Sequence, residues 1–196
     1  MIALMVVDNP KRWPLKVPGM ELVSASDYIS EPRFAAVANA RVFNLCRSYR
    51  YQAAGYYVSL LAAARGHKAI PSVDTIQDMK LSSIVRIAGE EMDELIQRTL
   101  RPLKSDHFEL SIYFGRNLTE KYDRLALSLF NQFPAPLLRA TFHRDGVWGI
   151  TALKVIGAAD IPEEHRPFVV EQAQHYLSRP SRRPRVKQAA RFDMAI

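Results

Sequence analysis

The chain has 196 residues, 48% of them hydrophobic and 24% charged, with one cysteine and a formal net charge of +7. This length suits one domain, and the composition is typical of globular proteins rather than disordered or collagen-like ones. One cysteine excludes an internal disulfide, no apolar run approaches the roughly 20 residues that cross a bilayer, and the N-terminus lacks a signal-peptide pattern. We therefore expect a cytoplasmic protein without membrane contacts.

The positive charge is concentrated near the C-terminus. Residues 177–196 contain six of the 27 basic residues and one of the 20 acidic residues, so the preceding part of the chain is nearly neutral. This tail has no interleaved aromatic residues before Phe192, which argues against stacking on single-stranded nucleic acid. Nucleic-acid binding through the tail is therefore an alternative rather than the first hypothesis, and it predicts affinity that falls steeply with salt.

In chain order, short apolar runs first predict strands over 2–7, 21–25 and 41–46. Residues 52–64 have the length of a helix and end before Gly66. They are apolar around most of the helix circumference, so we expect this helix to be buried. A further short strand is expected over 67–70.

The second half of the chain has clearer periodicity. Apolar residues from Ser82 to Leu100 follow a single helical stripe, and residues 108–114 alternate as in a half-buried strand. The next helix is expected to begin with Thr119 as its N-cap and to stop at the prolines of 134–136.

Two turn and capping signals complete the pattern. Asp145-Gly146 separates the strand-like runs 137–143 and 147–156, and this pair predicts a β-hairpin because both turn positions must accept positive φ. Asp160 and Glu163 resemble a capping box that opens the last helix. The sequence thus predicts an α/β fold in a single domain over 1–178, with a mixed sheet flanked by helices, a β-hairpin near 137–156, and a basic Pro/Arg linker over 179–190.

Familiar catalytic and metal-binding patterns are missing from the sequence. Cys46 and Arg47 could serve a small stand-alone enzyme, but nothing places a histidine beside Cys46, and a lone cysteine after an apolar strand is usually a core residue. The five histidines show no metal-ligand spacing, and no glycine-rich phosphate loop is present. The acidic pairs Glu90-Glu91 and Glu163-Glu164 are interpreted as helix-dipole complements or solvated charges. We expect no catalytic residue and no metal ligand in this chain.

Two polar corners remain as candidate binding sites. "FNLCRSYR" and "YFGRNLT" each lead from the end of a strand towards a helix N-terminus, where ligands of open α/β sheets bind. Arginine adds a bidentate fork for carboxylate or phosphate. The candidate anion-binding or substrate-binding residues are Asn44, Arg47, Ser48, Arg50, Arg116 and Asn117. The alternative is that these arginines pair with local carboxylates and cap the sheet.

Several long segments resemble a known family. "VVDNPKRWPL", "ARVFNLCRSYRYQAAGYYVSLLAAARGHKAIPSVDTIQD", "FELSIYFGRN" and "YDRLALSLFNQFPAPLLRA" together resemble the RimK-like ATP-grasp N-terminal domain, over roughly Val6 to Leu177. In that family the domain precedes an ATP-grasp region similar to ribosomal-protein glutamate ligases, which activate a carboxylate as an acyl phosphate and join it to an amine.

The resemblance implies that catalysis and the function of this domain belong to different regions. ATP and Mg²⁺ would be bound by a following ATP-grasp region, in the same or a separate chain, and this domain would be accessory, serving substrate recognition or domain docking. Its partners would be that C-terminal ATP-grasp domain and an amino-acid or peptide substrate, with nucleic acid not expected. "RFDMAI" at 191–196 would open the first strand of the next domain, which suggests a truncated chain, an isolated domain or the first part of a split gene.

Overall fold

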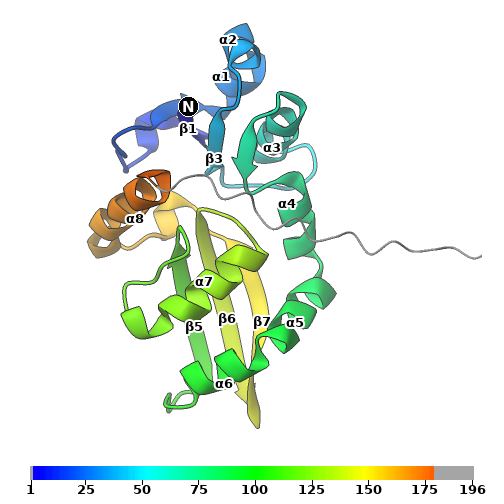
Figure 1. Ribbon diagram of the computed structural model, residues 1–196, viewed down its shortest axis with the longest axis vertical. Coiled ribbons are helices and arrows are strands. Elements are labelled where there is room, and N and C mark those ends of the chain that lie inside the picture. The colour runs from blue at the N-terminus through cyan, green and yellow to red at the C-terminus, as the bar shows by residue number, and fades with distance from the viewer. Residues whose placement is uncertain (1, 179–196) are drawn as a thin grey trace, which may run out of the picture.

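The computed structural model describes residues 2–178, and its strands form two sheets (Figure 1). The parallel sheet has the order β2-β1-β3-β4, and the antiparallel sheet has the order β5-β6-β7. The strands are β1 (Ala3–Val7), β2 (Glu21–Ser24), β3 (Arg41–Asn44), β4 (Lys68–Ile70), β5 (His107–Tyr113), β6 (Leu137–Asp145) and β7 (Val147–Val155). The helices are α1 (Ala25–Ser30), α2 (Pro32–Ala36), α3 (Ala54–Ala64), α4 (Val73–Lys80), α5 (Ser82–Glu91), α6 (Asp93–Leu100), α7 (Asp123–Gln132) and α8 (Arg166–Ser178).

The parallel sheet is buried on both faces. All five residues of β1 are buried, as expected for a central parallel strand that reads as a continuous apolar run. Leu4 and Val6 join the core beneath α1, α2 and α3, whereas Met5 and Val7 face the core shared with α8. The chain passes from β2 to β3 through α1 and α2 and from β3 to β4 through α3, whereas a loop with a 3-10 turn at Pro10–Arg12 leads from β1 to the parallel β2.

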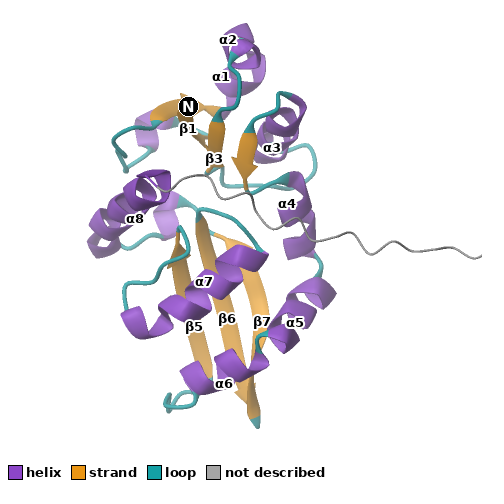
Figure 2. Ribbon diagram, in the orientation of Figure 1, coloured by secondary structure: helices purple, strands orange, loops and turns teal. Residues whose placement is uncertain are grey.

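The antiparallel sheet is covered on one face. Helices α5, α6 and α7 lie across that face in Figure 2, and their apolar side chains form a core with Leu110, Ile112 and Phe142. The predicted hairpin is present, since Asp145 pairs with Val147 across Gly146, whose φ is +71°. The opposite face exposes polar residues such as Glu109 and Lys154.

The two sheets meet through one shared core. In Figure 1 the parallel strands run from the N-terminus at the top towards the antiparallel sheet, so their carboxyl ends face it. Leu45, which follows β3, packs in the same core as Ile156 and Ile161, which follow β7. The polar residues after β1 and β3 therefore lie at a seam between the two parts of the molecule.

The α/β class and the hairpin are confirmed, with the strands divided between two sheets instead of joined in one. Residues 73–100 fold as three helices after β4, so β5 begins away from the parallel edge and pairs only with β6. No helix within residues 2–178 has the length and apolar character that crossing a membrane requires.

Four local expectations are corrected. The stripe over 82–100 is two helices, because Met92 leaves helical geometry with ψ of +9°. Helix α3 is only half-buried, because it covers one face of the sheet while Tyr57 and Leu60 remain 38% and 41% exposed. The other two corrections concern helix starts.

Two predicted caps do not cap their α-helices. Thr119 precedes a 3-10 turn and makes no side-chain cap bond, and α7 begins only at Asp123. Asp160 accepts a hydrogen bond from the Gly157 N–H at 2.9 Å, within a separate turn, and α8 begins at Arg166. In both cases a short turn separates the polar residue from the helix, and the spacing of the sequence pattern does not show it.

Candidate functional site

The first corner begins with Asn44, the last residue of β3, which is fully buried. Its amide donates to the Gly55 carbonyl at 2.6 Å and to Ser59 Oγ at 2.9 Å, both on α3. Its Oδ1 accepts from the Cys46 N–H at 3.3 Å. Because these bonds occupy the side chain, Asn44 ties β3 to α3 rather than facing a ligand.

Close main-chain packing explains why α3 can lie against this corner. A Cβ added at Gly55 would stand 2.5 Å from the Ser48 carbonyl oxygen and 2.8 Å from the Cys46 Cβ. Glycine is therefore required here by space, and the helix start is pressed against the loop after β3. Tyr49 closes the other side, donating its hydroxyl to the Asn44 carbonyl at 2.7 Å.

Cys46 is unsuited to nucleophilic catalysis. It is 1% exposed, and burial raises the pKa of its thiol far above the ordinary range, with the nearby Asp8 carboxylate adding to the effect. The thiolate is the reactive form, so a raised pKa keeps the group inert. Burial likewise raises the pKa of Tyr49, to which Cys46 and Asp8 contribute.

Asp8 joins the two central strands at the seam. It directly follows β1, and its Oδ2 accepts the Arg47 N–H at 2.7 Å. Asp8 is not among the candidate residues predicted from the sequence. Its position after a buried parallel strand is the signal that could have marked it, because carboxyl ends of parallel strands converge at one edge of the sheet.

The side chains of Arg47 and Arg50 are the free charges of this corner. Both residues are exposed, and their guanidinium groups form no hydrogen bond or ion pair with the described residues. The Arg50 N–H approaches Ser48 Oγ at 3.4 Å. Helix α3 starts beside them with Ala53 at the N-cap and no side-chain cap. The two guanidinium groups and the positive end of the α3 dipole each favour an anion at this corner.

The second corner has internal partners. Phe114 and Gly115 turn the chain with φ of +50° and +83°. Arg116 then pairs with Asp123 at 2.7 Å, at the start of α7. Asn117 donates its amide to the Ser111 carbonyl at 2.7 Å, while its N–H donates to the same Asp123 at 2.9 Å.

The six predicted residues thus lie in two separate networks. Within residues 2–178, no hydrogen bond or ion pair joins the corner after β3 to the corner after β5. Asn44, Arg116 and Asn117 hold the fold together, whereas Arg47, Ser48 and Arg50 line the seam. The same part of the chain contains no cluster of three or more metal-ligating side chains suited to a metal ion.

A comparison with protein-family models identifies residues 25–172 as a RimK-like ATP-grasp N-terminal domain. The match covers well over half of the chain, from α1 to the middle of α8. The chain belongs to the RimK-like ATP-grasp N-terminal domain family. A search of the curated proteins found no match.

Membership of the RimK-like ATP-grasp N-terminal domain family agrees with the resemblance in the sequence but has narrower bounds. The matched region includes both corners and lacks β1 and β2, so Asp8 lies outside it. The family description implies an ATP-grasp region as the partner of such a domain. The expected linker at 179–190 and the expected strand at 191–196 lie outside the described residues.

Proposed function

We propose that this chain is a non-catalytic accessory domain of an ATP-dependent carboxylate–amine ligase. In this proposal, ATP and Mg²⁺ act in the ATP-grasp region, and the present domain recognises an amino-acid or peptide substrate or docks that region, in the cytoplasm. The family match over residues 25–172 carries the proposal. No step of the ligase reaction is assigned to a residue of this chain.

The corner after β3, residues 44–50, supports a substrate-handling role; it is called the seam corner below. Arg47 and Arg50 are exposed cations beside a helix N-terminus without a side-chain cap, at the carboxyl edge of a parallel sheet. This arrangement suits a carboxylate, which accepts two parallel hydrogen bonds from one guanidinium. The competing proposal of a stand-alone enzyme at Cys46 and Arg47 is disfavoured by the burial and raised pKa of the thiol.

A ligand-dependent thermal shift tests the role of the corner. The purified chain is heated with L-glutamate, with triglutamate and with ATP·Mg²⁺, alongside the double variant Arg47→Gln, Arg50→Gln. We expect glutamate or triglutamate to raise the melting temperature of the wild type and not of the double variant. Arg124→Gln is the control, because Arg124 is an exposed arginine on α7, away from the corner.

The other outcomes separate the two accessory roles. An equal shift in the double variant would show that the anion binds elsewhere. It would contradict anion binding by Arg47 and Arg50. No shift with any ligand would contradict substrate recognition and leave docking, which predicts that the chain co-purifies with a RimK-like ATP-grasp catalytic region. Failure of both measurements would overturn the proposed function.

A further inference from the structure

Two histidines stand directly opposite each other on the antiparallel sheet. His107 begins β5, His143 lies near the end of β6, and the register of the two strands pairs them. The Arg144 N–H donates to the Asp106 carbonyl at 2.9 Å, so the next pair along, His107 with His143, is of the non-hydrogen-bonded type. Side chains are closest in such pairs, with their Cβ atoms about 4.5–5.5 Å apart.

Both imidazoles lie on the solvent-exposed face of this sheet. Phe108 and Phe142, the neighbours of the two histidines, pack in the core under α5, α6 and α7. Alternation along each strand therefore places His107 and His143 on the other face. Both histidines are exposed, and neither ring forms a hydrogen bond, ion pair or ring contact with the described residues. The two rings are thus available to an added ligand.

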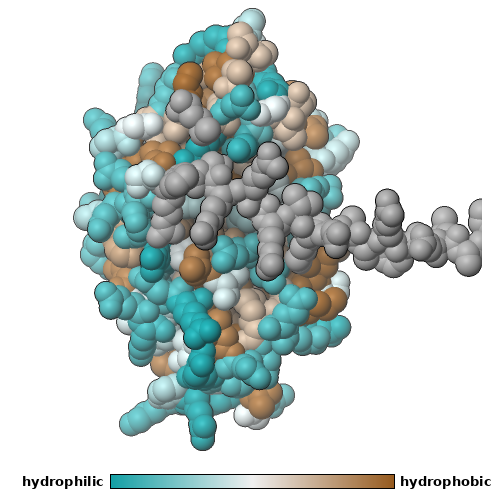
Figure 3. Space-filling view, viewed as in Figure 1, coloured by the Kyte–Doolittle hydropathy of each residue, from teal (hydrophilic) through white to brown (hydrophobic). Residues whose placement is uncertain are grey.

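The space beside the pair is open. The residue opposite His143 on β7 is Gly149, and a Cβ added there would meet no atom within 4 Å. Glu109 lies two residues after His107 on the same face and is exposed, so its carboxylate favours a cation near the rings. Figure 3 shows mainly hydrophilic side chains at the lower end of the molecule, where the hairpin lies in Figure 1.

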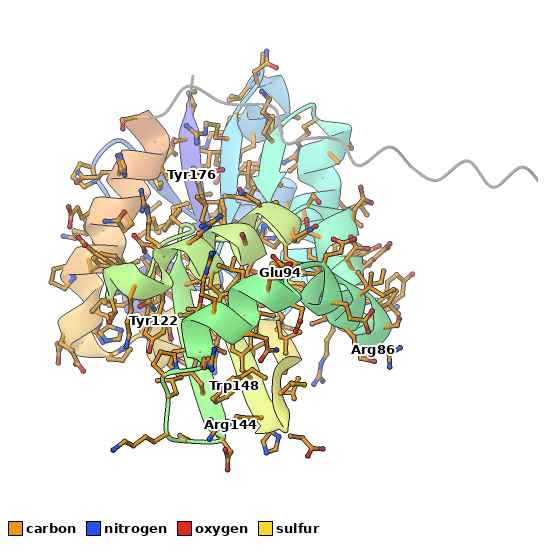
Figure 4. The ribbon with its side chains drawn as sticks, turned by 60° about the horizontal axis from the view of Figure 1, so that its bottom comes forward. Arg86, Glu94, Tyr122, Arg144, Trp148 and Tyr176 are labelled. Atoms are coloured by element: carbon orange, nitrogen blue, oxygen red, sulfur yellow. The ribbon has the colours of Figure 1, made fainter. Side chains whose placement is uncertain are left out.

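Arg144 holds the loop before β5 against the hairpin. Its Nε donates to the Asp106 carboxylate at 2.7 Å, and its terminal nitrogens donate to the Leu103 and Lys104 carbonyls at 3.2 Å each. The guanidinium also lies 5.3 Å from the centroid of the Trp148 ring, and Figure 4 shows both side chains at the lower end of the sheet. The charge of Arg144 is therefore already paired with Asp106.

The start of β5 is fixed as well. Ser105 Oγ donates to the His107 carbonyl at 2.8 Å and accepts from the His107 N–H at 3.1 Å. With the main chain of both strands held in this way, binding an ion between His107 and His143 requires only side-chain rotation. The conformational entropy lost on binding is correspondingly small.

We infer that His107 and His143 together bind a divalent transition-metal ion of the zinc, nickel and copper group. Imidazole nitrogen is a preferred ligand of these ions. Two imidazoles from opposite strands form a chelate, with each nitrogen about 2.0–2.1 Å from zinc. Water fills the other coordination positions, because residues 2–178 contain no cluster of three or more metal-ligating side chains suited to an ion. The ion clamps the start of β5 to the end of β6.

The spacing of histidines along the chain does not show this site. His107 and His143 are far apart in the sequence and belong to no metal-binding motif, and only the strand register brings them together. The metal site is also independent of the proposed function. It lies at the hairpin end of the antiparallel sheet, away from the seam corner, and shares no residue with it (Figure 1).

Calorimetric titration of the purified chain, without a histidine tag, with zinc chloride measures the site. We expect saturable binding of zinc. His107→Gln and His143→Gln should each weaken zinc binding at least tenfold, because a single imidazole does not chelate. His175→Gln is the matched control, since His175 is an exposed histidine on α8, and it should leave the affinity unchanged. Circular dichroism without metal checks that each variant folds.

Moving the histidines tests the geometry itself. Thr141 lies opposite Glu109, in the next pair of the same type on the same face. His143→Thr with Thr141→His moves one histidine out of the pair and should weaken zinc binding. Adding His107→Glu with Glu109→His places two histidines opposite each other again and should recover most of the lost affinity. A purely structural effect of the substitutions would not produce this recovery.

A spectroscopic signature comes from copper. Electron paramagnetic resonance of the chain with one equivalent of Cu²⁺ should show two imidazole nitrogens on the ion in the wild type and one in either single variant. Three results would overturn the site: no saturable binding at millimolar zinc, unchanged affinity when both histidines are replaced, or no recovery when both are moved. Each leaves the seam corner untouched, because the thermal-shift test of Arg47 and Arg50 decides the proposed function separately.

Discussion

The seam corner after β3 and the junction of α5 with β7 differ in how far packing satisfies their polar residues. At the corner, the Asn44 side chain forms hydrogen bonds with α3 and with the Cys46 N–H, so it is already paired. At the end of α5, Glu90 lies 3.8 Å from Arg86 in an exposed ion pair, and on β7 the buried Trp148 indole N–H has no hydrogen-bond partner among residues 2–178. A polar residue at a strand end is therefore not by itself a binding residue, and what matters is whether packing has already used it.

Two glycines show the same difference in packing. Gly55 is pressed against main-chain and Cβ atoms, whereas an added Cβ at Gly89 would meet chiefly the Cγ2 methyl of Ile150, at 2.5 Å. Backbone cannot yield without moving a strand or helix, but a side chain can shift. The corner around Gly55 should therefore tolerate an added methyl group less well than the contact around Gly89.

The largest expected effect is at Gly55. Gly55→Ala should lower the free energy of unfolding by about 3 kcal/mol, because the new methyl group clashes with the Ser48 carbonyl and the Cys46 Cβ. Urea unfolding followed by circular dichroism measures the change. Gly149→Ala is the control, since a Cβ there meets nothing within 4 Å. Similar stability of the two variants would contradict the close packing of α3 against the loop after β3.

Asn44 should come next. Asn44→Ala leaves the buried Gly55 carbonyl, Ser59 hydroxyl and Cys46 N–H without this partner, and should cost about 2 kcal/mol in unfolding free energy. Asn131→Ala, an exposed change on α7, should stay within about 0.5 kcal/mol of the wild type. If Asn44→Ala lowered the unfolding free energy as little as Asn131→Ala does, the hydrogen bonds of Asn44 would not be structural. Asn44 would then again be a candidate ligand-binding residue.

Cys46 should make stability depend on pH. Because its folded pKa is raised above the unfolded value, the unfolded state releases the thiol proton first. Stability is then full below pH about 8.5 and falls above it, by at most about 1.4 kcal/mol per pH unit. Urea unfolding at pH values of about 7.5, 8.5 and 9.5 measures how the free energy of unfolding changes with pH. Cys46→Ala should remove most of this change. The same slope in that variant would assign the effect to other groups.

Gly89 should give the smallest effect. Gly89→Ala should destabilise the chain by about 1 kcal/mol, because the methyl group of Ile150 must move. Combining it with Ile150→Ala removes that methyl group, so the cost of Gly89→Ala should fall towards zero in the double-mutant cycle. An unchanged cost would show that α5 and β7 do not meet through this contact.

Much of the antiparallel part was predictable from the sequence. The Asp145-Gly146 turn and the alternation after Phe108 depend on neighbouring residues, and the structure confirms both as the hairpin of β6 and β7 and as β5. The break at Met92 was not predictable, since the apolar stripe continues on both sides of it. The placement of Glu90 at a helix end follows from that break.

The sequence by itself determined the α/β class, the hairpin and the family, because these depend on local periodicity, turn chemistry and long segments of resemblance. Only the tertiary structure decided which polar side chains remain free. Arg116 found Asp123 through the turn at Phe114 and Gly115, while Arg47 and Arg50 stayed exposed at the seam. The physical reason is that a hydrogen bond or ion pair depends on distances in space, and these distances are set by turns such as Phe114-Gly115 and by the packing of the elements.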